Sequence, residues 1–475
     1  MMRSLYSAVS GLKTHQTRMD VIGNNISNVN TEAFKASSVR FSEIMYQTTS
    51  SASAGNGATG IGGVNAKQIG LGVSTASTMC SVTSAGAAET TGNPFDLRLS
   101  DSQTTNFFVV SDGTNTYFTR AGSFYVDGNG YLCMSSTGYT LQGWQVDPVS
   151  GEIRKDTVSA LQVMSPENQT SAPEATTKAY VSGVLDKNDS NVTGDGGYVM
   201  TLGFYDDLGY SYTAKFSVTP VKNNGADVDG HYTIALTDII DDNGSILSAD
   251  ENTRKTQLQN IFNGTGTTPG IEMVYDTNEG TFVSIGGNGT DGKPMTSAML
   301  NMEYLTTATP SEDGKTSNFS NIEIDFSRSL NYNNGGTSTM KALKGDIQGD
   351  GTGKKLGALT GITVDQSGMV YGSYDNGNTV LLCQIAAAQF ANASGLEKVG
   401  NNCYQTTLNS GEFDGIGVEI NADGSKMNSG ELEMSNVDLS GEFTSMIVTQ
   451  RGFQANSRVI TVSDTLLEEL INLKR

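Results

Sequence analysis

The chain has 475 residues, long enough for two to four ordinary domains, and it is rich in glycine (56) and poor in proline (8). Its 50 acidic and 29 basic residues give a formal net charge of −21. Nucleic-acid backbones and anionic membrane surfaces attract clustered cations, so this charge argues against both as partners. Because no run approaches 18 apolar residues and the first residues lack an apolar signal core, we expect neither membrane insertion nor a cleaved secretory signal.

The residue types that build common catalytic and metal sites are scarce. His15 and His231 are the only histidines, too few for a multi-histidine metal site or a histidine-based catalytic relay. The cysteines form no C-x-x-C pair, so we expect them to be small buried hydrophobic residues: Cys80, Cys133, Cys383 and Cys403. We therefore expect no catalytic residue, no metal and no cofactor.

Apolar residues recur every seven positions near the beginning of the chain. This spacing predicts a helix with one apolar stripe, made of Leu5, Leu12, Met19 and Ile26.

The same spacing is longer near the end of the chain and predicts a second helix of roughly 50 Å, at about 1.5 Å per residue. Asp438 and Glu442 suit its amino-terminal end, where the helix dipole favours negative charge. Its stripe consists of Leu439, Met446, Phe453, Ile460 and Leu467, with Phe443 between them.

Such stripes commonly pack within one chain as a helical hairpin. Polar residues at intermediate positions, such as Gln16, Ser457 and Asp464, instead favour a partly wet assembly of many helices. The fold class predicted is a multidomain α plus all-β protein. Its terminal helices, in residues 1–47 and 431–475, pair in a coiled-coil-like inner domain.

Residues 48–92 are rich in Ser, Thr, Ala and Gly and are predicted to be a connector or extended arm. Within them, residues 55–60 match G-x-G-x-x-G literally. A dinucleotide site needs a strand before that motif and a helix after it, and neither is indicated.

Alternating apolar segments separated by Asp-Gly pairs predict a β-meander over residues 94–146. Trp144 is expected to pack in a core or at a domain edge. The segment Val126-Asp127-x-x-Gly130-x-Leu132 is echoed by Val364-Asp365-x-x-Gly368-x-Val370. The echo suggests that 93–165 and 356–430 build one discontinuous β-domain around an inserted outer β-domain, 166–355, of one or two subdomains. Acidic stretches at 238–242 and 346–350 lack calcium-loop spacing and are expected to be solvated turns.

Two terminal motifs resemble those of the flagellar axial family of rod, hook and hook-associated proteins. The first is Ser10-Gly11-Leu12 with the run 20–35, DVIGNNISNVNTEAFK, and the second is SNVDLSGEF at 435–443 with QRGFQANS at 450–457. Ala33 departs from the family, which usually has Gly there. Phe107-Phe108-Val109 with residues 117–124 is similar to the β-domain that hook and distal rod proteins share. The length and the insertion favour the hook branch over the shorter distal rod branch.

The resemblance implies a structural subunit, not an enzyme, that polymerises into a short curved flexible tube and transmits torque from motor and rod to filament. It also implies these partners: further copies of the chain, distal rod and hook–filament junction proteins, the hook cap, and the flagellar type III export apparatus. The subunit would lie outside the cell, in the flagellum, after export without a cleaved signal. The apolar stripes would form the inner tube, and five motif residues could hydrogen-bond within or between subunits: Asn24, Asn25, Asn28, Gln450 and Asn456.

Two alternatives remain. A distal rod subunit of the flagellar basal body would share the helices and the β-meander but form a straight tube. A β-rich carbohydrate-active enzyme could show similar glycine and asparagine content and use paired carboxylates. It would not need seven-residue repeats at both ends of the chain.

Overall fold

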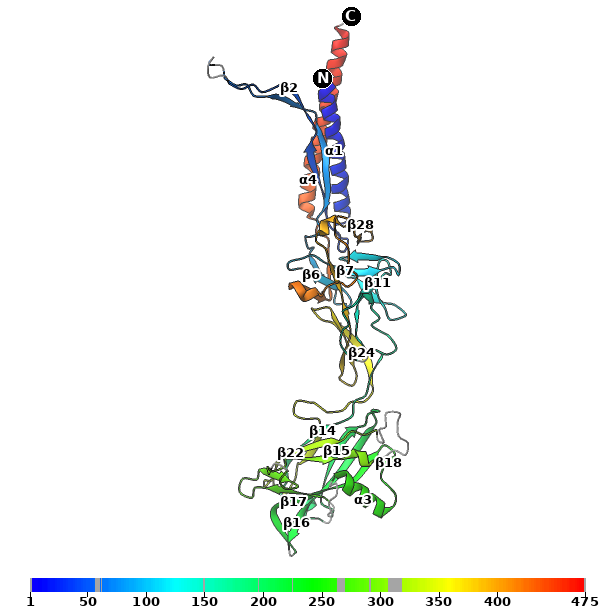
Figure 1. The fold of residues 1–475 in the computed structure, drawn as a ribbon, viewed down its shortest axis with the longest axis vertical. Coiled ribbons are helices and arrows are strands. Elements are labelled where there is room, and N and C mark those ends of the chain that lie inside the picture. The colour runs from blue at the N-terminus through cyan, green and yellow to red at the C-terminus, as the bar shows by residue number, and fades with distance from the viewer. Residues whose placement is uncertain are drawn as a thin grey trace. The chain divides into compact units, whose positions relative to one another are not determined.

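A computed structural model describes residues 2–55, 60, 62–147, 150–194, 196–223, 225–262, 270–289, 292–305 and 318–473. It is mostly β, with one long helix near each end of the chain (Figure 1). Residues 56–59 of the G-x-G-x-x-G match lie outside the described residues, and so do the last two residues, Lys474 and Arg475.

The elements follow in chain order. Up to residue 168 they are α1 (Met2–Ser27), β1 (Ser37–Glu43), β2 (Tyr46–Ser50), β3 (Lys67–Gly70), β4 (Val73–Cys80), β5 (Ala88–Thr90), β6 (Leu97–Ser100), β7 (Asn106–Ser111), β8 (Thr116–Thr119), β9 (Phe124–Val126), β10 (Leu132–Met134), β11 (Thr140–Gln145) and β12 (Ser159–Ala160). The next are β13 (Thr170–Ser171), β14 (Lys178–Val184), α2 (Ser190–Thr193), β15 (Tyr198–Tyr205), β16 (Ser211–Asn223), β17 (Ala226–Asp241), β18 (Gly244–Ser245), α3 (Glu251–Phe262), β19 (Ile271–Tyr275), β20 (Phe282–Ile285), β21 (Ser297–Leu300), β22 (Ile322–Leu330) and β23 (Lys341–Lys344). The last are β24 (Gly357–Val364), β25 (Met369–Tyr374), β26 (Thr379–Ile385), β27 (Ala387–Gln389), β28 (Glu397–Gly400), β29 (Cys403–Gln405), β30 (Lys426–Ser429), β31 (Glu431–Glu433) and α4 (Leu439–Asn472).

Two compact units divide the chain. Unit 1 comprises residues 1–168, 361–372 and 379–475, and unit 2 comprises residues 169–360 and 373–378. The boundary at 168 lies close to the start predicted for the insertion. The finer division into four domains stays a prediction.

In unit 1, strands from distant parts of the chain form one sheet, which includes the path β26-β11-β7-β8-β29-β28. The strands predicted for the meander are present as β7 to β10, but they form two hairpins, β7 with β8 and β9 with β10, because β8 pairs next with β29 and not with β9. The core of this region includes Phe107, Phe118 and Tyr404, all at most 2% exposed. Trp144 is buried as expected, and its indole nitrogen donates to the Asp156 carbonyl at 3.1 Å. Two short ladders, β30 with β6 and β31 with β5, attach the segment before α4 to this region.

Unit 2 holds a sheet in the order β21-β22-β14-β23 and another that contains β15-β16-β17-β19-β20. They share one hydrophobic core with side chains such as Leu202, Phe216 and Ile324. Helix α3 was not predicted, because its apolar residues Leu258, Ile261 and Phe262 gather at one end and leave no periodic stripe. Its first turn is instead stabilised locally by Asp250, whose carboxylate accepts from the Thr253 amide at 3.0 Å.

The echoed segments are the same turn. In each, a glycine at positive φ donates its amide to the aspartate carbonyl, from Gly130 to Asp127 at 3.1 Å and from Gly368 to Asp365 at 2.9 Å. The turn also recurs in unit 2, where Gly209 donates to Asp206 and Gly349 donates to Asp346. The echo therefore marks a repeated hairpin turn, and it is no argument that two segments share a domain.

Part of the segment predicted as a connector is ordered as strands. β1 pairs with β4, and β2 pairs with β3 as a two-stranded hairpin. Ser, Thr and Val supply the β-propensity here despite the glycine-rich composition.

The turn after α1 contains a strained residue. Ala33 has φ 52°, in the left-handed region that glycine adopts most readily, and it is only 1% exposed. This conformation lets its amide donate to the Glu433 carbonyl at 2.8 Å. The turn therefore forms without a glycine at this position, because Ala33 adopts the glycine-like conformation.

Replacing Ala33 with glycine is expected to stabilise the protein. The left-handed conformation costs an alanine about 1–2 kcal/mol, and glycine loses about 0.5–1 kcal/mol more conformational entropy on folding, so the net gain is up to about 1.5 kcal/mol. Urea unfolding of Ala33→Gly measures it. Ala36→Gly, three residues on and outside the positive-φ region, is the control and should destabilise. Equal losses in both variants would contradict the strain at Ala33.

Candidate functional site

Helices α1 and α4 lie side by side and antiparallel within unit 1 (Figure 1). A Cβ atom added to Gly11 would lie 2.7 Å from the Asn456 amide nitrogen, and one added to Gly452 would lie 2.7 Å from the His15 ring. The Asn25 amide donates to the Glu442 carboxylate at 2.9 Å. The residue numbers of each facing pair add to 467, which sets the register of the two helices.

Small and polar residues form this seam, although an apolar stripe was predicted on each helix. The buried residues of α4 are Thr449 and Ser463, and those of α1 include Ala8, Gly11 and Asn25. Glycine at the contact lets the two backbones approach closely.

The predicted stripes flank this seam. Leu5, Leu12, Met19 and Ile26 are half-buried, as are Met446, Ile460 and Leu467. Leu439, Phe443 and Phe453 are 38%, 51% and 37% exposed. The role of these residues in assembly stays a prediction. Asp438 caps α4 as its position indicated, with its carboxylate accepting from the Ser440 amide at 3.0 Å.

The side-chain amides of the motif residues have different surroundings. Asn25 is 1% exposed and ties α1 to β1, because its side chain donates to the Ser37 carbonyl and accepts from the Ser37 amide. Asn28 donates to the Asn24 carbonyl at the end of α1. Asn456 lies in the seam and Gln450 is exposed.

Sequence reasoning missed a second apolar stripe on α4. It lies about 100° around the helix from the seam, at about 100° per residue. Its residues are exposed: Val448 60%, Val459 41%, Val462 56%, Leu466 45% and Leu473 84%. The sequence carries this signal as a second seven-residue spacing. Val459, Leu466 and Leu473 are seven residues apart, and Val448 and Val462 are fourteen residues apart.

Sequence reasoning also missed a buried ionic clasp, formed by Lys35, Asp101, Arg120 and Glu433. The Lys35 ammonium donates to Glu433 Oε1 at 2.7 Å, and Arg120 Nε donates to Glu433 Oε2 at 2.9 Å. Arg120 also donates to Asp101 at 2.7 Å. The Lys35, Arg120 and Glu433 side chains are at most 1% exposed.

The clasp joins residues at the ends of four elements. Lys35 precedes β1, Asp101 follows β6, Arg120 follows β8 and Glu433 ends β31. Its backbone partners add a fifth segment, because the Gly86 amide donates to Glu433 and Lys35 donates to the Ser84 carbonyl. Both terminal helices therefore leave the β-region from a common anchoring point.

Burial alone would raise the pKa of Glu433, but the adjacent Arg120 and Lys35 cations outweigh it and lower that pKa. Burial lowers the pKa of Lys35 despite the Glu433 carboxylate beside it. The paired cations therefore decide the direction of the Glu433 shift, and burial decides that of Lys35.

The cysteines and histidines lie among structural contacts of the fold. Cys133, Cys383 and Cys403 are buried as expected, while Cys80 is half-buried. His15 lies in the helix seam against Phe41, and His231 Nδ1 lies 2.7 Å from Glu272. In the described ranges, no three His, Cys, Asp or Glu side chains are grouped to hold a metal ion. None of the helices described is both long and apolar enough to cross a membrane.

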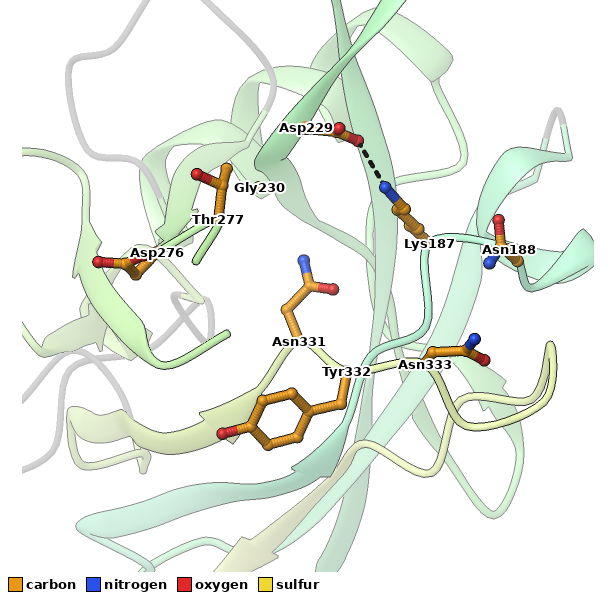
Figure 2. Close-up of a pocket in the computed structure, with 9 residues that line it drawn as sticks. All are labelled: Lys187, Asn188, Asp229, Gly230, Asp276, Thr277, Asn331, Tyr332 and Asn333. Carbon is orange, nitrogen blue, oxygen red and sulfur yellow. Dashed lines mark hydrogen bonds and ion pairs between the residues drawn. The ribbon is translucent and has the colours of Figure 1, made fainter. Parts of the chain in front are cut away.

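A polar cavity of about 190 Å³ lies in unit 2 (Figure 2). Its main polar groups already have partners within the chain. Lys187 lies 3.2 Å from Asp229, Asn331 donates to the Tyr232 hydroxyl at 3.1 Å, and Asp276 accepts two amides of its own turn. We infer no ligand from it.

Three family models match the chain. Residues 5–35 match "Flagella basal body rod protein", residues 103–179 match "Flagellar hook protein FlgE/F/G D1 domain", and residues 428–473 match "Flagellar basal body rod FlgEFG protein C-terminal". Each matched segment supplies one member of the clasp, namely Lys35, Arg120 and Glu433. The chain is thus a flagellar axial protein of the rod and hook class.

Full-length relatives narrow the class. A flagellar hook protein of Treponema pallidum is 35% identical over 100% of both chains. A flagellar basal-body rod protein of Bacillus subtilis is 29% identical, also over 100% of both. The crystal structure of a Helicobacter pylori flagellar hook protein matches 73% of this chain and 100% of its own, with 12% identity and a TM-score of 0.39. The chain belongs to the flagellar hook protein family, whose members are structural proteins and not enzymes.

Replacing Glu433 with glutamine is expected to destabilise unit 1 by about 3–5 kcal/mol, because it leaves buried Lys35 and Arg120 without their carboxylate. Urea unfolding measures the loss. Glu431→Gln breaks a partly exposed pair with Arg98 and should cost less than about 1 kcal/mol.

The pH profile gives a second measure of the same change. The Glu433 pKa is lower in the folded chain than its ordinary 4.5, so its stabilisation is complete above pH 4.5 and is lost as pH falls below it. Glu433→Gln should flatten this acid loss. An unchanged profile would contradict the role of Glu433.

Proposed function

We propose that this chain is the structural subunit of a bacterial flagellar hook. It polymerises with further copies into a curved flexible tube that transmits torque from the rod to the filament. Membership of the hook protein family supports the proposal, and so does the exposed second stripe of α4. A subunit that keeps one apolar helix face out of its own fold has a surface for its neighbours.

The predicted stripes and the second stripe have complementary roles in this proposal. The half-buried residues, such as Met446 and Ile460, brace α4 against α1 in a coiled-coil-like inner domain. The exposed residues, such as Val462 and Leu466, pack on neighbouring copies. Head-to-tail contacts between identical subunits that do not close into a ring generate a helical tube.

The proposal also assigns roles to unit 2 and to the partners of the subunit. Unit 2 supplies the outer domain, and its contacts with neighbouring copies slide as the tube bends. The subunit reaches the outside of the cell through the flagellar type III export apparatus without a cleaved signal, assembles beneath the hook cap, and meets distal rod and hook–filament junction proteins at the two ends of the tube.

A distal rod subunit is the alternative, since a rod protein also aligns over the whole chain. Immunogold electron microscopy of isolated basal bodies, with antibody against residues 166–355, separates the two. Label along the curved segment outside the envelope is expected. Label on the straight rod alone would favour the rod assignment.

Replacing Val462 with aspartate is expected to abolish polymerisation, because it places a charge in an apolar contact between copies. Sedimentation and negative-stain microscopy of the purified chain measure assembly, and circular dichroism checks folding. Thr461→Asp, one residue away and about 100° around α4, should still polymerise. Ile460→Asp tests the predicted stripe in the same way, and normal tubes from either Val462→Asp or Ile460→Asp would contradict the role of that residue.

A further inference from the structure

The imidazole of His15 packs where three elements of unit 1 meet. His15 belongs to α1 and lies against Gly452 of α4, where an added Cβ atom would be 2.7 Å from the imidazole Cε1 and 2.8 Å from Nε2. Strand β1 contributes Phe41, whose ring meets the imidazole edge to face with the ring centroids 5.4 Å apart. A titratable side chain therefore lies inside the contact between the two terminal helices.

One nitrogen of this imidazole is buried without a hydrogen bond. Among the residues that the structure describes, Nδ1 of His15 has no hydrogen-bond partner. A neutral imidazole has one nitrogen without a proton, and that nitrogen can occupy such a position. A protonated imidazole carries an N–H on both nitrogens, so it would bury a donor that has no acceptor, and an unsatisfied buried donor is costly. The closed seam therefore favours the neutral form of His15.

A positive charge is held beside the same ring. The Arg18 guanidinium lies over the Phe41 ring, 5.6 Å from its centroid. A fixed cation disfavours a second positive charge close to it. Burial, and after it the charge of Arg18, lowers the pKa of His15 below its ordinary 6.5.

The α4 side of the seam supplies no compensating carboxylate at this level. The charged residue next to Gly452 is Arg451, which is also positive. The nearest acidic residues of α4 on either side are Glu442 and Asp464, about 15 and 18 Å from Gly452 along the helix axis. A proton on His15 would thus gain no ion pair from α4.

The charged residues of the other elements around His15 are exposed. On β1 these are Arg40 and Glu43, and the Glu43 carboxylate accepts from the Tyr46 hydroxyl at 2.5 Å. Strand β4, which pairs with β1, has no charged residue. On α1 itself, Lys13 and Asp20 are exposed.

We propose that His15 is an acid-sensitive switch in the seam between α1 and α4. The seam closes around a neutral imidazole and opens locally when His15 binds a proton, because the protonated ring leaves a buried N–H unpaired and adds a charge beside Arg18. The switch lies within one chain, so it does not depend on the proposed function.

The direction of the pH effect follows from proton linkage. In the open seam His15 has its ordinary pKa of 6.5, and in the closed seam its pKa is lower. The contribution of His15 to closure is therefore complete above pH 6.5 and is lost as the pH falls below it. At about pH 5.5, protonation should favour the open seam by up to about tenfold.

Hydrogen exchange of the full-length chain, followed by mass spectrometry, tests the proposal. Local opening of the seam exposes backbone amides of α4, so peptides from residues 445–460 report on it. The unsubstituted chain and His15→Gln are compared at the same pH, because the intrinsic chemistry of exchange then cancels in their ratio. From about pH 7.5 to about pH 5.5, exchange in the unsubstituted chain should become up to about tenfold faster relative to His15→Gln.

His231→Gln is the matched control, since His231 is the other histidine of the chain. Its side chain is 37% exposed and lies beside Glu272 in unit 2, so its loss should leave the pH response of residues 445–460 unchanged. Peptides from β16 and β17 of unit 2 should exchange alike in the unsubstituted chain and in His15→Gln. His15→Leu is the second neutral variant if glutamine itself loosens the seam at the higher pH.

Three results would overturn the switch. The first is a ratio between the unsubstituted chain and both His15 variants that does not change with pH. The second is a pH response that disappears in His231→Gln. The third is an absence of protection in residues 445–460 of the unsubstituted chain at about pH 7.5, because the seam would then not be closed around the neutral imidazole. None of these results bears on whether copies of the chain polymerise, so the proposed function is tested separately.

Discussion

The architecture of unit 1 depends on one buried carboxylate. Glu433 accepts from Lys35, Arg120 and the Gly86 amide, so three distant parts of the chain must arrive together for its charge to be compensated. An uncompensated buried charge is costly, and replacing buried ion pairs by apolar side chains is often neutral or stabilising. We infer that the clasp contributes geometry more than net stability: it fixes where both terminal segments leave the β-region.

Because the clasp fixes where both helices leave the β-region, the helix seam can consist of small and polar residues. Once the clasp and the Asn25–Glu442 hydrogen bond hold the two helices together at one end, their contact further along needs little apolar burial. Gly11, Gly452 and Thr449 give a close but weakly hydrophobic contact, and apolar area is worth about 25 cal/mol per Å². The larger apolar side chains of α4 therefore remain available on faces that α1 does not cover.

Local patterns predicted the parts of this fold that local physics determines. The seven-residue spacing predicted α1 and α4, Asp438 indicated where α4 begins, and Asp-Gly pairs predicted the two hairpins β7–β8 and β9–β10. Helix α3 was not predicted, because its stability comes from a cap and from burial of one end. The clasp was not predicted, because Lys35 and Glu433 are far apart in the sequence and local periodicity does not indicate such a pairing. The stripes of α1 and α4 and the pairing of the two helices were predicted. The small and polar residues that form the seam were not, because the periodicity of apolar residues does not report them.

A joint that transmits torque while bending needs stiffness and compliance in different places. Lys35, Arg120 and Glu433 of the ionic clasp are buried, so moving their charges apart would leave unpaired charged groups at high cost. The small-residue seam and the half-exposed stripes of α4 are the opposite case, because they bury modest apolar area and include few hydrogen bonds that sliding would break. We infer that each subunit stays rigid where its helices join the β-region, and that bending is taken up by the contacts between copies.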